Sequence, residues 1–344
     1  MIKEYIKKVV EKKDLSYSEA KEAFISILDS KVSPVQVSAF LIGLRMKGES
    51  LYEILALSEI MRERSVKLNV KEGKEDFVLD TCGTGGKPIK TFNISTCTAF
   101  VVSSLGIKVA KHGNRSFSGR CGSADVIEKL GINISLLPDI VEKAVKSIGI
   151  GFIYAPLFHP AMKQVAGLRK EIGVRTIFNL AGPLTNPAGA DIQVLGVYSP
   201  DLTEKIAGVL KNLGLRKAMV IWGEDVCDEV SITGKTKVSE LKQGEVSTYY
   251  LTPEDFGLSP EKFSELKGGT VSENMDSILS VLGGEPSAKL NIVLANASLC
   301  LVLSGLAENF KQGVSLALSS IKSGKALGKL EELKAFLSPS SKNK

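Results

Sequence analysis

A chain of 344 residues that is 44% hydrophobic and 24% charged has the composition of a soluble globular protein with a substantial core. Its 44 basic residues exceed its 38 acidic residues only slightly. That balance argues against a dedicated nucleic-acid-binding protein and is compatible with phosphorylated substrates. We find no signal peptide and no apolar run long enough to span a bilayer, so we expect a cytoplasmic protein without a membrane segment. Five cysteines, an odd number without metal-ligand spacing, indicate free thiols.

The first part of the chain, up to about residue 70, predicts helices alone. Apolar residues at helical spacing form one face of a first helix: Ile2, Tyr5, Ile6, Val9 and Val10. Capping boxes, in which a serine is followed three residues later by a glutamate, precede a second and a fourth helix at Ser16–Glu19 and Ser50–Glu53. Ser33 and Pro34 begin the third helix, and Gly48 is placed to end it. We therefore expect an all-α domain over residues 1–72.

Beyond a charged link at residues 71–75, short apolar runs alternate with helical patterns. The runs lie at residues 77–79, 107–110, 151–154, 194–198 and 218–222. Strands that alternate with helices predict a largely parallel central sheet covered by helices on both faces. The pattern returns to helices from Asn274 onward. The expected fold class is α/β with a small N-terminal all-α domain. The α/β domain would cover residues 76–338, and a segment near residues 170–190 would join the helical domain.

Three glycines in four residues follow the first predicted strand, in the segment from Asp80 to Gly86. Glycine permits positive φ and close approach of the backbone to a ligand, and successive N–H groups in such a turn can bind an anion. A tight turn between a strand and a helix is the simpler alternative. Pro88 stands where a P-loop requires Ser or Thr, and the glycine spacing does not match the dinucleotide-binding fingerprint.

Two further segments carry groups that suit phosphate. Asn93, Ser95 and Thr96 stand at the expected start of a helix, where they can cap it or leave its N–H groups for a phosphate. Residues 111–116 place two cations, an imidazole and an amide after a predicted buried strand, and ligands of open α/β sheets bind at that edge. A solvated charged loop is the alternative. Residues 122–125 then open another helix.

Later segments add arginines and acids. His159 begins a helix that carries Arg169, and a second arginine follows at Arg175. Arginine binds carboxylate or phosphate through two hydrogen bonds, although a surface ion pair is the simpler expectation for Arg175. Asp228 and Glu229 follow a predicted strand and its loop. We expect these loop acids to be exposed, either merely solvated or acting as ligands of Mg²⁺, a cation that prefers oxygen donors.

Taken together, these segments resemble a known family. The strings GTGG, NIST, KHGNR with GSAD, HPAMKQVAGLRKEIGVRTIFNLAGPLTNPA and DEVS have the order and spacing of the anthranilate phosphoribosyltransferase family. The resemblance is strong over roughly residues 30–235. It implies transfer of the 5-phosphoribosyl group of phosphoribosyl pyrophosphate (PRPP) to the amino group of anthranilate, a Mg²⁺-dependent step of tryptophan biosynthesis. It also implies a homodimer formed through the helical domain and an active site between the domains.

By position, the resemblance also implies site residues. The implied PRPP contacts are Gly83, Gly86, Thr91, Asn93, Ser95, Thr96, Lys111, Ser118, Gly119 and Ser123. The implied anthranilate contacts are Gly83, Asn114 and Arg169, with His112 and Pro183 nearby. The implied Mg²⁺ ligands are Ser95, Asp228 and Glu229. No residue is assigned as an acid, a base or a covalent nucleophile. The reaction needs stabilisation of the departing pyrophosphate and positioning of a weakly basic amine.

One position departs from the family pattern. The family continues GTGG with Asp, whereas this chain has Lys87 followed by Pro88. We expect the Lys87 ammonium to lie close to the pyrophosphate of PRPP, with a side chain in solvent as the alternative. Two other functions stay open: a pyrimidine nucleoside phosphorylase, which shares the two-domain architecture, and a relative that binds nucleic acid without transferase activity. Asp228, Glu229 and Arg169 argue against the second of these.

Overall fold

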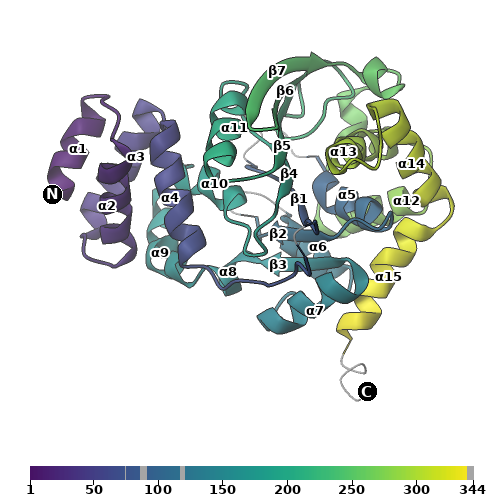
Figure 1. The fold of residues 1–344 in the computed structure, drawn as a ribbon, viewed down its shortest axis with the longest axis horizontal. Helices are drawn as coiled ribbons and strands as arrows, with labels where there is room; N and C mark the ends of the chain where they lie inside the picture. Colours follow the sequence, from purple (N-terminus) through teal and green to yellow (C-terminus); the bar gives the residue numbers. More distant parts are fainter. Residues whose placement is uncertain (74, 86–90, 117–120, 339–344) are drawn as a thin grey trace.

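The computed structural model describes residues 1–73, 75–85, 91–116 and 121–338, and its first four helices form a bundle at one end of the molecule (Figure 1). They are α1 (Ile2–Val10), α2 (Tyr17–Leu28), α3 (Pro34–Lys47) and α4 (Leu51–Glu63). The predicted caps are confirmed, because Ser16, Ser33 and Ser50 each accept a side-chain hydrogen bond from the backbone N–H three residues on. On the apolar face predicted for α1, Tyr5 and Val9 are buried, whereas Val10 is 66% exposed.

The larger part of the molecule is built on a sheet whose seven described strands have the order β3-β2-β1-β4-β5-β6-β7. The strands are β1 (Leu79–Gly83), β2 (Val109–Gly113), β3 (Ile150–Tyr154), β4 (Ile192–Gly196), β5 (Lys217–Gly223), β6 (Thr236–Lys242) and β7 (Glu245–Leu251). Strands β1 to β5 pair in parallel, and β6 and β7 add to them antiparallel. The predicted sheet, largely parallel, is confirmed with its five expected strands, whereas β6 and β7 are absent from the sequence prediction.

Helices cover both faces of this sheet (Figure 1). We call one side the α5 face: there the strand residues Leu79, Val109 and Val194 share a core with α5 (Ile94–Ser103). We call the other side the α10 face: there Leu195 and Val220 share a core with α10 (Ile177–Ala181), α11 (Leu202–Asn212) and the helical bundle. Three further helices are α6 (Ser123–Lys129), α7 (Pro138–Ile148) and α8 (Ala155–Phe158), of which α7 and α8 contact β3.

The segment after α8 packs against the helical bundle. Helix α9 (Lys163–Ile172) contacts α2 and α3, and α10 contacts α3 and α4. The ring of Phe178 in α10 meets that of Phe24 in α2 edge-on, with 6.4 Å between ring centroids. This packing agrees with an association of residues 170–190 with the helical domain, while the domain boundaries at residues 72 and 76 stay predictions.

Between Val271 and Leu337 the regular elements are all helices, as predicted from Asn274 onward. The elements are α12 (Val271–Leu282), α13 (Ala288–Ser304), α14 (Phe310–Lys322) and α15 (Lys325–Leu337). Helix α13 is apolar and largely buried in the core of the α5 face. Among the described residues, no helix combines the length and the apolar character that crossing a membrane requires.

Candidate active site

Four parallel strands end in glycine at the same edge of the sheet. They are Gly83 in β1, Gly113 in β2, Gly196 in β4 and Gly223 in β5. A Cβ atom at Gly196 would lie 1.8 Å from the carbonyl oxygen of Asp228, and one at Gly83 would lie 2.5 Å from its Oδ2. A side chain at either position would displace the loop that carries Asp228. The glycines therefore let this loop cross the carboxyl ends of the strands, where open α/β sheets bind ligands.

The loop brings the predicted acidic pair into the sheet edge. Asp228 and Glu229 are only 7% and 8% exposed, so the expectation of exposed acids is wrong. Their burial follows from the glycine strand ends, which admit the loop instead of leaving it in water. Asp228 Oδ2 accepts a hydrogen bond from the N–H of Gly85 at 3.0 Å. The loop closes through reciprocal backbone bonds of 2.8 Å between Gly223 and Cys227.

The donor atoms at this edge suit Mg²⁺. Two neighbouring carboxylates supply hard oxygen ligands. The third predicted ligand, Ser95, accepts a hydrogen bond from Lys111 Nζ at 3.3 Å, which leaves its hydroxyl oxygen a further lone pair. Residues 1–73, 75–85, 91–116 and 121–338 contain no group of three or more His, Cys, Asp or Glu suited to a metal. A magnesium ion here would complete its coordination with water or phosphate oxygens, as Mg²⁺ commonly does.

The start of α5 lies beside a buried ammonium group. Lys111 is 3% exposed, and its Nζ donates to the carbonyl oxygen of Thr81 at 2.7 Å as well as to Ser95. Asn93 precedes α5, but its side chain makes no capping hydrogen bond within the described structure. The hydroxyl of Thr96 is buried and has no hydrogen-bond partner in the same described residues. The capping alternative is therefore not realised by Asn93, and the phosphate-binding hypothesis stays a prediction.

The loop after β2 is fixed to the start of α6. Ser123 Oγ donates to the carbonyl oxygen of Asn114 at 3.3 Å. Arg115 forms ion pairs with Asp125 at 2.8 Å and with Glu128 at 2.9 Å. Because two carboxylates engage its guanidinium, Arg115 is a poor candidate for an anion ligand. The side chain of Asn114 is exposed and that of Ser123 is half-buried, so both can be reached from solvent.

Neutral polar groups gather on the α10 face. The rings of His112 and His159 lie 5.1 Å apart between centroids. Burial lowers the pKa of His112 well below its usual value and lowers the pKa of His159 to about 4. Both imidazoles are therefore neutral near physiological pH. His112 Nε2 is buried without a hydrogen-bond partner in the part of the chain that the structure describes.

A buried carboxylate connects these groups to the bend before β4. Asp80 Oδ1 accepts a hydrogen bond from the backbone N–H of His112 at 3.3 Å, and its Oδ2 lies 3.5 Å from Gln193 Nε2. Burial raises the pKa of Asp80, and the nearby charge of Lys111 acts in the opposite sense. Gln193 Nε2 also donates to the carbonyl oxygen of Pro183 at 2.7 Å. This chain of contacts brings Pro183 to the sheet.

The two arginine candidates lie beside aromatic rings on the helical-domain side. The guanidinium of Arg169 lies 5.3 Å from the ring centroid of Phe178, and its Nη2 is 3.5 Å from Asn179 Oδ1. Burial lowers the pKa of Arg169. Arg175 is half-buried, with its guanidinium 4.2 Å from the ring centroid of Tyr198. Arg169 thus approaches from α9, the helix that packs on the bundle.

Several predicted site residues meet directly, and others lie beyond the described residues. The direct contacts join Asp228 with the Gly83–Gly85 segment, Ser95 with Lys111, and Ser123 with Asn114. Thr91 is buried and forms an isolated β-bridge with Lys267. The four predicted residues outside the described ranges are Gly86, Lys87, Ser118 and Gly119.

Sequence reasoning missed two buried polar residues of this region. Asp80 stands directly before the glycine cluster, but it received no role in the prediction. Gln193 is the amide in β4, a strand that is otherwise Ile, Val, Leu and Gly. A polar side chain inside an otherwise apolar strand is the signal that identifies Gln193.

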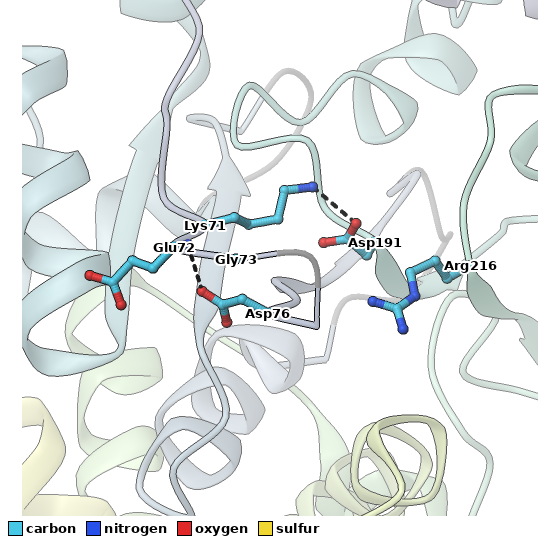
Figure 2. Close-up of a pocket in the computed structure, with 6 residues that line it drawn as sticks. All are labelled: Lys71, Glu72, Gly73, Asp76, Asp191 and Arg216. Carbon is cyan, nitrogen blue, oxygen red and sulfur yellow. Dashed lines mark hydrogen bonds and ion pairs between the residues drawn. The ribbon is translucent and has the colours of Figure 1, made fainter.

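A hollow of about 600 Å³ lies at the opposite edge of the sheet (Figure 2). It is lined by Lys71, Glu72, Gly73, Asp76, Asp191 and Arg216. Lys71 and Asp191 pair across it at 3.0 Å. These residues adjoin the amino ends of β1, β4 and β5, whereas the predicted site residues on the strands lie toward the carboxyl ends. Since open parallel sheets bind ligands at the carboxyl ends of their strands, the hollow is not the candidate active site.

Comparison with known families matches both parts of the chain. Residues 3–65 match the helical bundle domain of the glycosyl transferase family, and residues 75–327 match its a/b domain. The anthranilate phosphoribosyltransferase of Persephonella marina is 48% identical, over 98% of this chain and 99% of its own. That of Acetivibrio thermocellus is also 48% identical, over 98% of this chain and 96% of its own.

Solved structures agree with this result. The crystal structure of anthranilate phosphoribosyltransferase from Thermus thermophilus has a TM-score of 0.89 and 40% identity, covering 97% of this chain and 99% of that one. The Saccharomyces cerevisiae enzyme in complex with PRPP and Mg has a TM-score of 0.88 and 30% identity, covering 99% and 98% of the two chains. Another structure of the yeast enzyme holds 4-fluoroanthranilate, at a TM-score of 0.87 and 29% identity over the same shares. These matches favour neither the nucleoside phosphorylase nor the nucleic-acid-binding alternative.

Proposed function

The chain belongs to the anthranilate phosphoribosyltransferases of the glycosyl transferase family, and on that premise we propose that it transfers the 5-phosphoribosyl group of PRPP to anthranilate. The products are N-(5-phosphoribosyl)anthranilate and pyrophosphate, in tryptophan biosynthesis. The observation that carries the proposal is the acidic loop seated in the glycine-ended strands, with Asp228 joined to Gly85. It gathers metal-binding oxygens and ligand-approachable backbone at one sheet edge.

PRPP would lie along this edge on the side of the α5 face. The proposed contacts are Gly83, Gly86, Lys87, Thr91, Asn93, Ser95, Thr96, Lys111, Ser118, Gly119 and Ser123. Two observations support this set of contacts. The ammonium of Lys111 is buried, and the buried hydroxyl of Thr96 has no hydrogen-bond partner among the residues that the structure describes. Such groups, together with the N–H groups at the start of α5, suit phosphate oxygens.

Ser95, Asp228 and Glu229 would hold Mg²⁺. Their oxygen donors suit that ion, and Lys111 fixes the hydroxyl of Ser95 by hydrogen bonding. When bound, the ion supplies positive charge that stabilises the pyrophosphate as it departs. The yeast relative, whose structure contains PRPP and Mg, supports the same pair of ligands for this chain.

Anthranilate would enter from the α10 face. The proposed contacts are Gly83, His112, Asn114, Arg169 and Pro183. Arg169 would pair with the carboxylate of anthranilate, since a guanidinium offers two parallel donors to such a group. The imidazole of His112 is neutral, and its Nε2 has no hydrogen-bond partner among the described residues. This nitrogen would face a polar group of the acceptor.

The residues act mainly through charge and position. The bond between ribose C1 and the pyrophosphate oxygen breaks, the amine nitrogen bonds to C1, and the amine loses one proton. Negative charge therefore grows on the leaving group while the sugar becomes cationic, and preorganised donors such as Lys111 stabilise that change. Arg169 and the Pro183 bend would hold the amine in line with C1, which lowers the entropic part of the barrier.

We further propose that two copies associate through the helical bundle. Helix α3 buries one apolar face in the bundle, yet a second apolar stripe points outward: Val35, Ala39, Ile42 and Met46. Val35 and Met46 are 79% and 80% exposed, and the exposed Val10 of α1 adds to this surface. A helix that is apolar on opposite faces needs a partner for each face. A second copy provides one, as in closed dimers that use the same patch twice.

Sedimentation tests the dimer. We expect a dimer for the parent protein and a monomer for Val35→Glu/Met46→Glu, because buried carboxylates at the interface lack partners. Val174→Glu changes an exposed apolar residue outside the bundle and should stay dimeric. A monomeric parent, or a dimeric double variant, would overturn this interface.

The activity has a direct assay. Purified protein with PRPP, Mg²⁺ and anthranilate should consume anthranilate, followed as loss of its fluorescence, and release one pyrophosphate per turnover. Omission of PRPP or chelation of Mg²⁺ should stop the reaction. If anthranilate persists while pyrophosphate is released with another aromatic amine, the acceptor assignment is wrong.

A further inference from the structure

Gln193 lies at the centre of the α10 face, next to the proposed anthranilate contacts. It is 2% exposed and stands directly opposite Asp80 in the parallel pairing of β1 with β4. Its Nε2 lies 2.7 Å from the carbonyl oxygen of Pro183, 3.2 Å from Cys82 Sγ and 3.5 Å from Asp80 Oδ2. The amide thus connects β1, through Asp80 and Cys82, to the bend at Pro183 that precedes β4.

The chemistry of its neighbours fixes the orientation of this amide. A backbone carbonyl only accepts hydrogen bonds. The opposite orientation would place the amide oxygen of Gln193 against the carbonyl oxygen of Pro183, so the NH₂ group must face Pro183. Asp80 is itself held by the backbone N–H of His112. The donor to Pro183 is therefore positioned by groups that do not move with the bend.

Three side-chain hydrogen bonds fasten the bend, two from other elements and one from the bend itself. Besides Gln193 from β4, Arg62 of α4 donates through Nε to the carbonyl oxygen of Leu184 at 2.7 Å. Asn186 donates through Nδ2 to the carbonyl oxygen of Ala110 in β2 at 2.8 Å. Of the three, Gln193 is the one that holds Pro183 itself. Its hydrogen bond sets the distance between Pro183 and the strand ends that carry Gly83 and His112.

We infer that Gln193 is a positioning residue for the aromatic acceptor: by holding the carbonyl of Pro183, it sets the width of the anthranilate site without touching either substrate. This inference rests on the proposed function and adds a residue to it. PRPP and its metal lie toward the opposite face of the sheet in that proposal, so Gln193 should affect one substrate and not the other.

The test is Gln193→Met, which keeps the length of the side chain and removes the donor. The KM for anthranilate should rise about tenfold, the equivalent of the roughly 1.4 kcal/mol that a lost hydrogen bond to a buried carbonyl can cost. The KM for PRPP should change less than about twofold, because distant sites that share no contacts affect each other by only a few tenths of a kcal/mol. Gln193→Asn keeps an amide but withdraws it from Pro183 by one methylene, and should give the same split if the Met variant folds poorly.

Asn296 supplies the matched control on the other face. This buried amide of α13 accepts a hydrogen bond at Oδ1 from the backbone N–H of Val230, the residue after Glu229, at 3.2 Å. Asn296→Leu removes an equivalent buried hydrogen bond, so it should raise the KM for PRPP and leave that for anthranilate near the parent value. If one variant raises only the KM for anthranilate and the other only the KM for PRPP, the effects come from positioning and not from a general loss of stability.

The outcomes are distinct. A parent protein that does not consume anthranilate refutes the proposed function. A parent that is active, with Gln193→Met and Gln193→Asn showing either the parental KM for anthranilate or an equal rise in both KM values, refutes the role of Gln193 alone. A lower kcat with both KM values unchanged also refutes it, because that result reflects only a smaller active fraction.

Discussion

The two faces of the sheet differ in the charge of the buried basic side chains that they hold. On the α5 face, Lys111 is buried but finds oxygen acceptors on Thr81 and Ser95. On the α10 face, burial keeps the imidazoles of His112 and His159 neutral. One side therefore suits a multiply charged phosphorylated donor, and the other suits a flat aromatic acceptor of lower charge. The difference teaches how one sheet edge can offer two unlike substrates different surroundings.

The largest effect that would break this comparison is expected at the acidic loop. Asp228→Ala/Glu229→Ala should lower turnover by about a hundredfold or more and weaken PRPP binding, because the oxygens proposed to bind the metal are gone. The melting temperature should fall too, since the half-buried N–H of Gly85 loses its acceptor, a change worth about 1 kcal/mol. Steady-state kinetics and thermal melting check both effects.

The control for the acid variant is Glu245→Ala, which removes an exposed carboxylate from β7. It should behave as the parent in both measurements. Near-parental turnover in a folded double variant would remove Asp228 and Glu229 from the mechanism.

A smaller effect, confined to the other substrate, is expected at Arg169. Arg169→Ala should raise the KM for anthranilate about 10- to 100-fold, the range for a lost charge-assisted hydrogen bond, and leave that for PRPP nearly unchanged. Kinetics with each substrate varied in turn check this. Arg175→Ala removes the arginine stacked on Tyr198 and should show no such split. A change in the KM for PRPP would instead assign Arg169 to a phosphate site.

The neutral histidines make the stability of the fold depend on pH. The pKa of His159 is lowered from its usual 6.5 to about 4, so the unfolded chain takes up this proton before the folded protein does. The stabilisation is complete above pH 6.5 and declines as the pH falls toward 4, by up to roughly 3 kcal/mol. His112, whose pKa is also lowered, acts in the same direction.

Urea unfolding between pH 7.5 and 4.5 measures this dependence. The free energy of unfolding of His159→Gln should fall less steeply with decreasing pH than that of the parent, because one titrating group is gone. Parallel curves for the two proteins would show that His159 titrates normally in the folded state.

The smallest expected effect concerns Lys87, where the sequence departs from the pattern expected of the family. If its ammonium lies near the pyrophosphate, the parent should work at low Mg²⁺ and be inhibited strongly by pyrophosphate, because release of that product is slow. Lys87→Asp should need several-fold more Mg²⁺ and be inhibited less. Lys71→Asp, at the far edge of the sheet, is the control (Figure 2). Superimposable Mg²⁺ titrations for Lys87→Asp and the parent, with and without pyrophosphate, would reject the idea.

Features encoded by a few adjacent residues could be predicted from the sequence. The serine caps of α2, α3 and α4 depend on a side chain and a backbone group three residues away, so the local sequence is enough to predict them. The parallel strands β3, β4 and β5 are mostly apolar, because both of their faces are buried, and the apolar runs at 77–79 and 107–110 lead into β1 and β2. Strand β7 escaped prediction since it lies at the sheet edge and exposes most of its residues, including Tyr250 at 59%.

Features that depend on distant parts of the chain could not be predicted in the same way. Asp228 and Glu229 are an ordinary hydrophilic pair in sequence, and their burial results from glycines that end strands far away in the chain. The contact of Gln193 with Pro183 likewise requires the bend to fold back on β4. Resemblance to the family supplied Pro183 but not Gln193, because the motif strings stop before that strand.

The glycine that ends β4 has a consequence for mutational scans of this protein. With 1.8 Å between a hypothetical Cβ at Gly196 and the carbonyl oxygen of Asp228, every substitution there moves the acidic loop, alanine included. Gly223 is similar, at 2.5 Å from the carbonyl oxygen of Glu229. In a survey scored by growth without tryptophan, both glycines would tolerate as little change as a residue that binds the metal. Such a survey would therefore count these two glycines among the catalytic residues. Separate measurements of protein abundance and metal affinity would distinguish residues that support the acidic loop from residues that bind the metal.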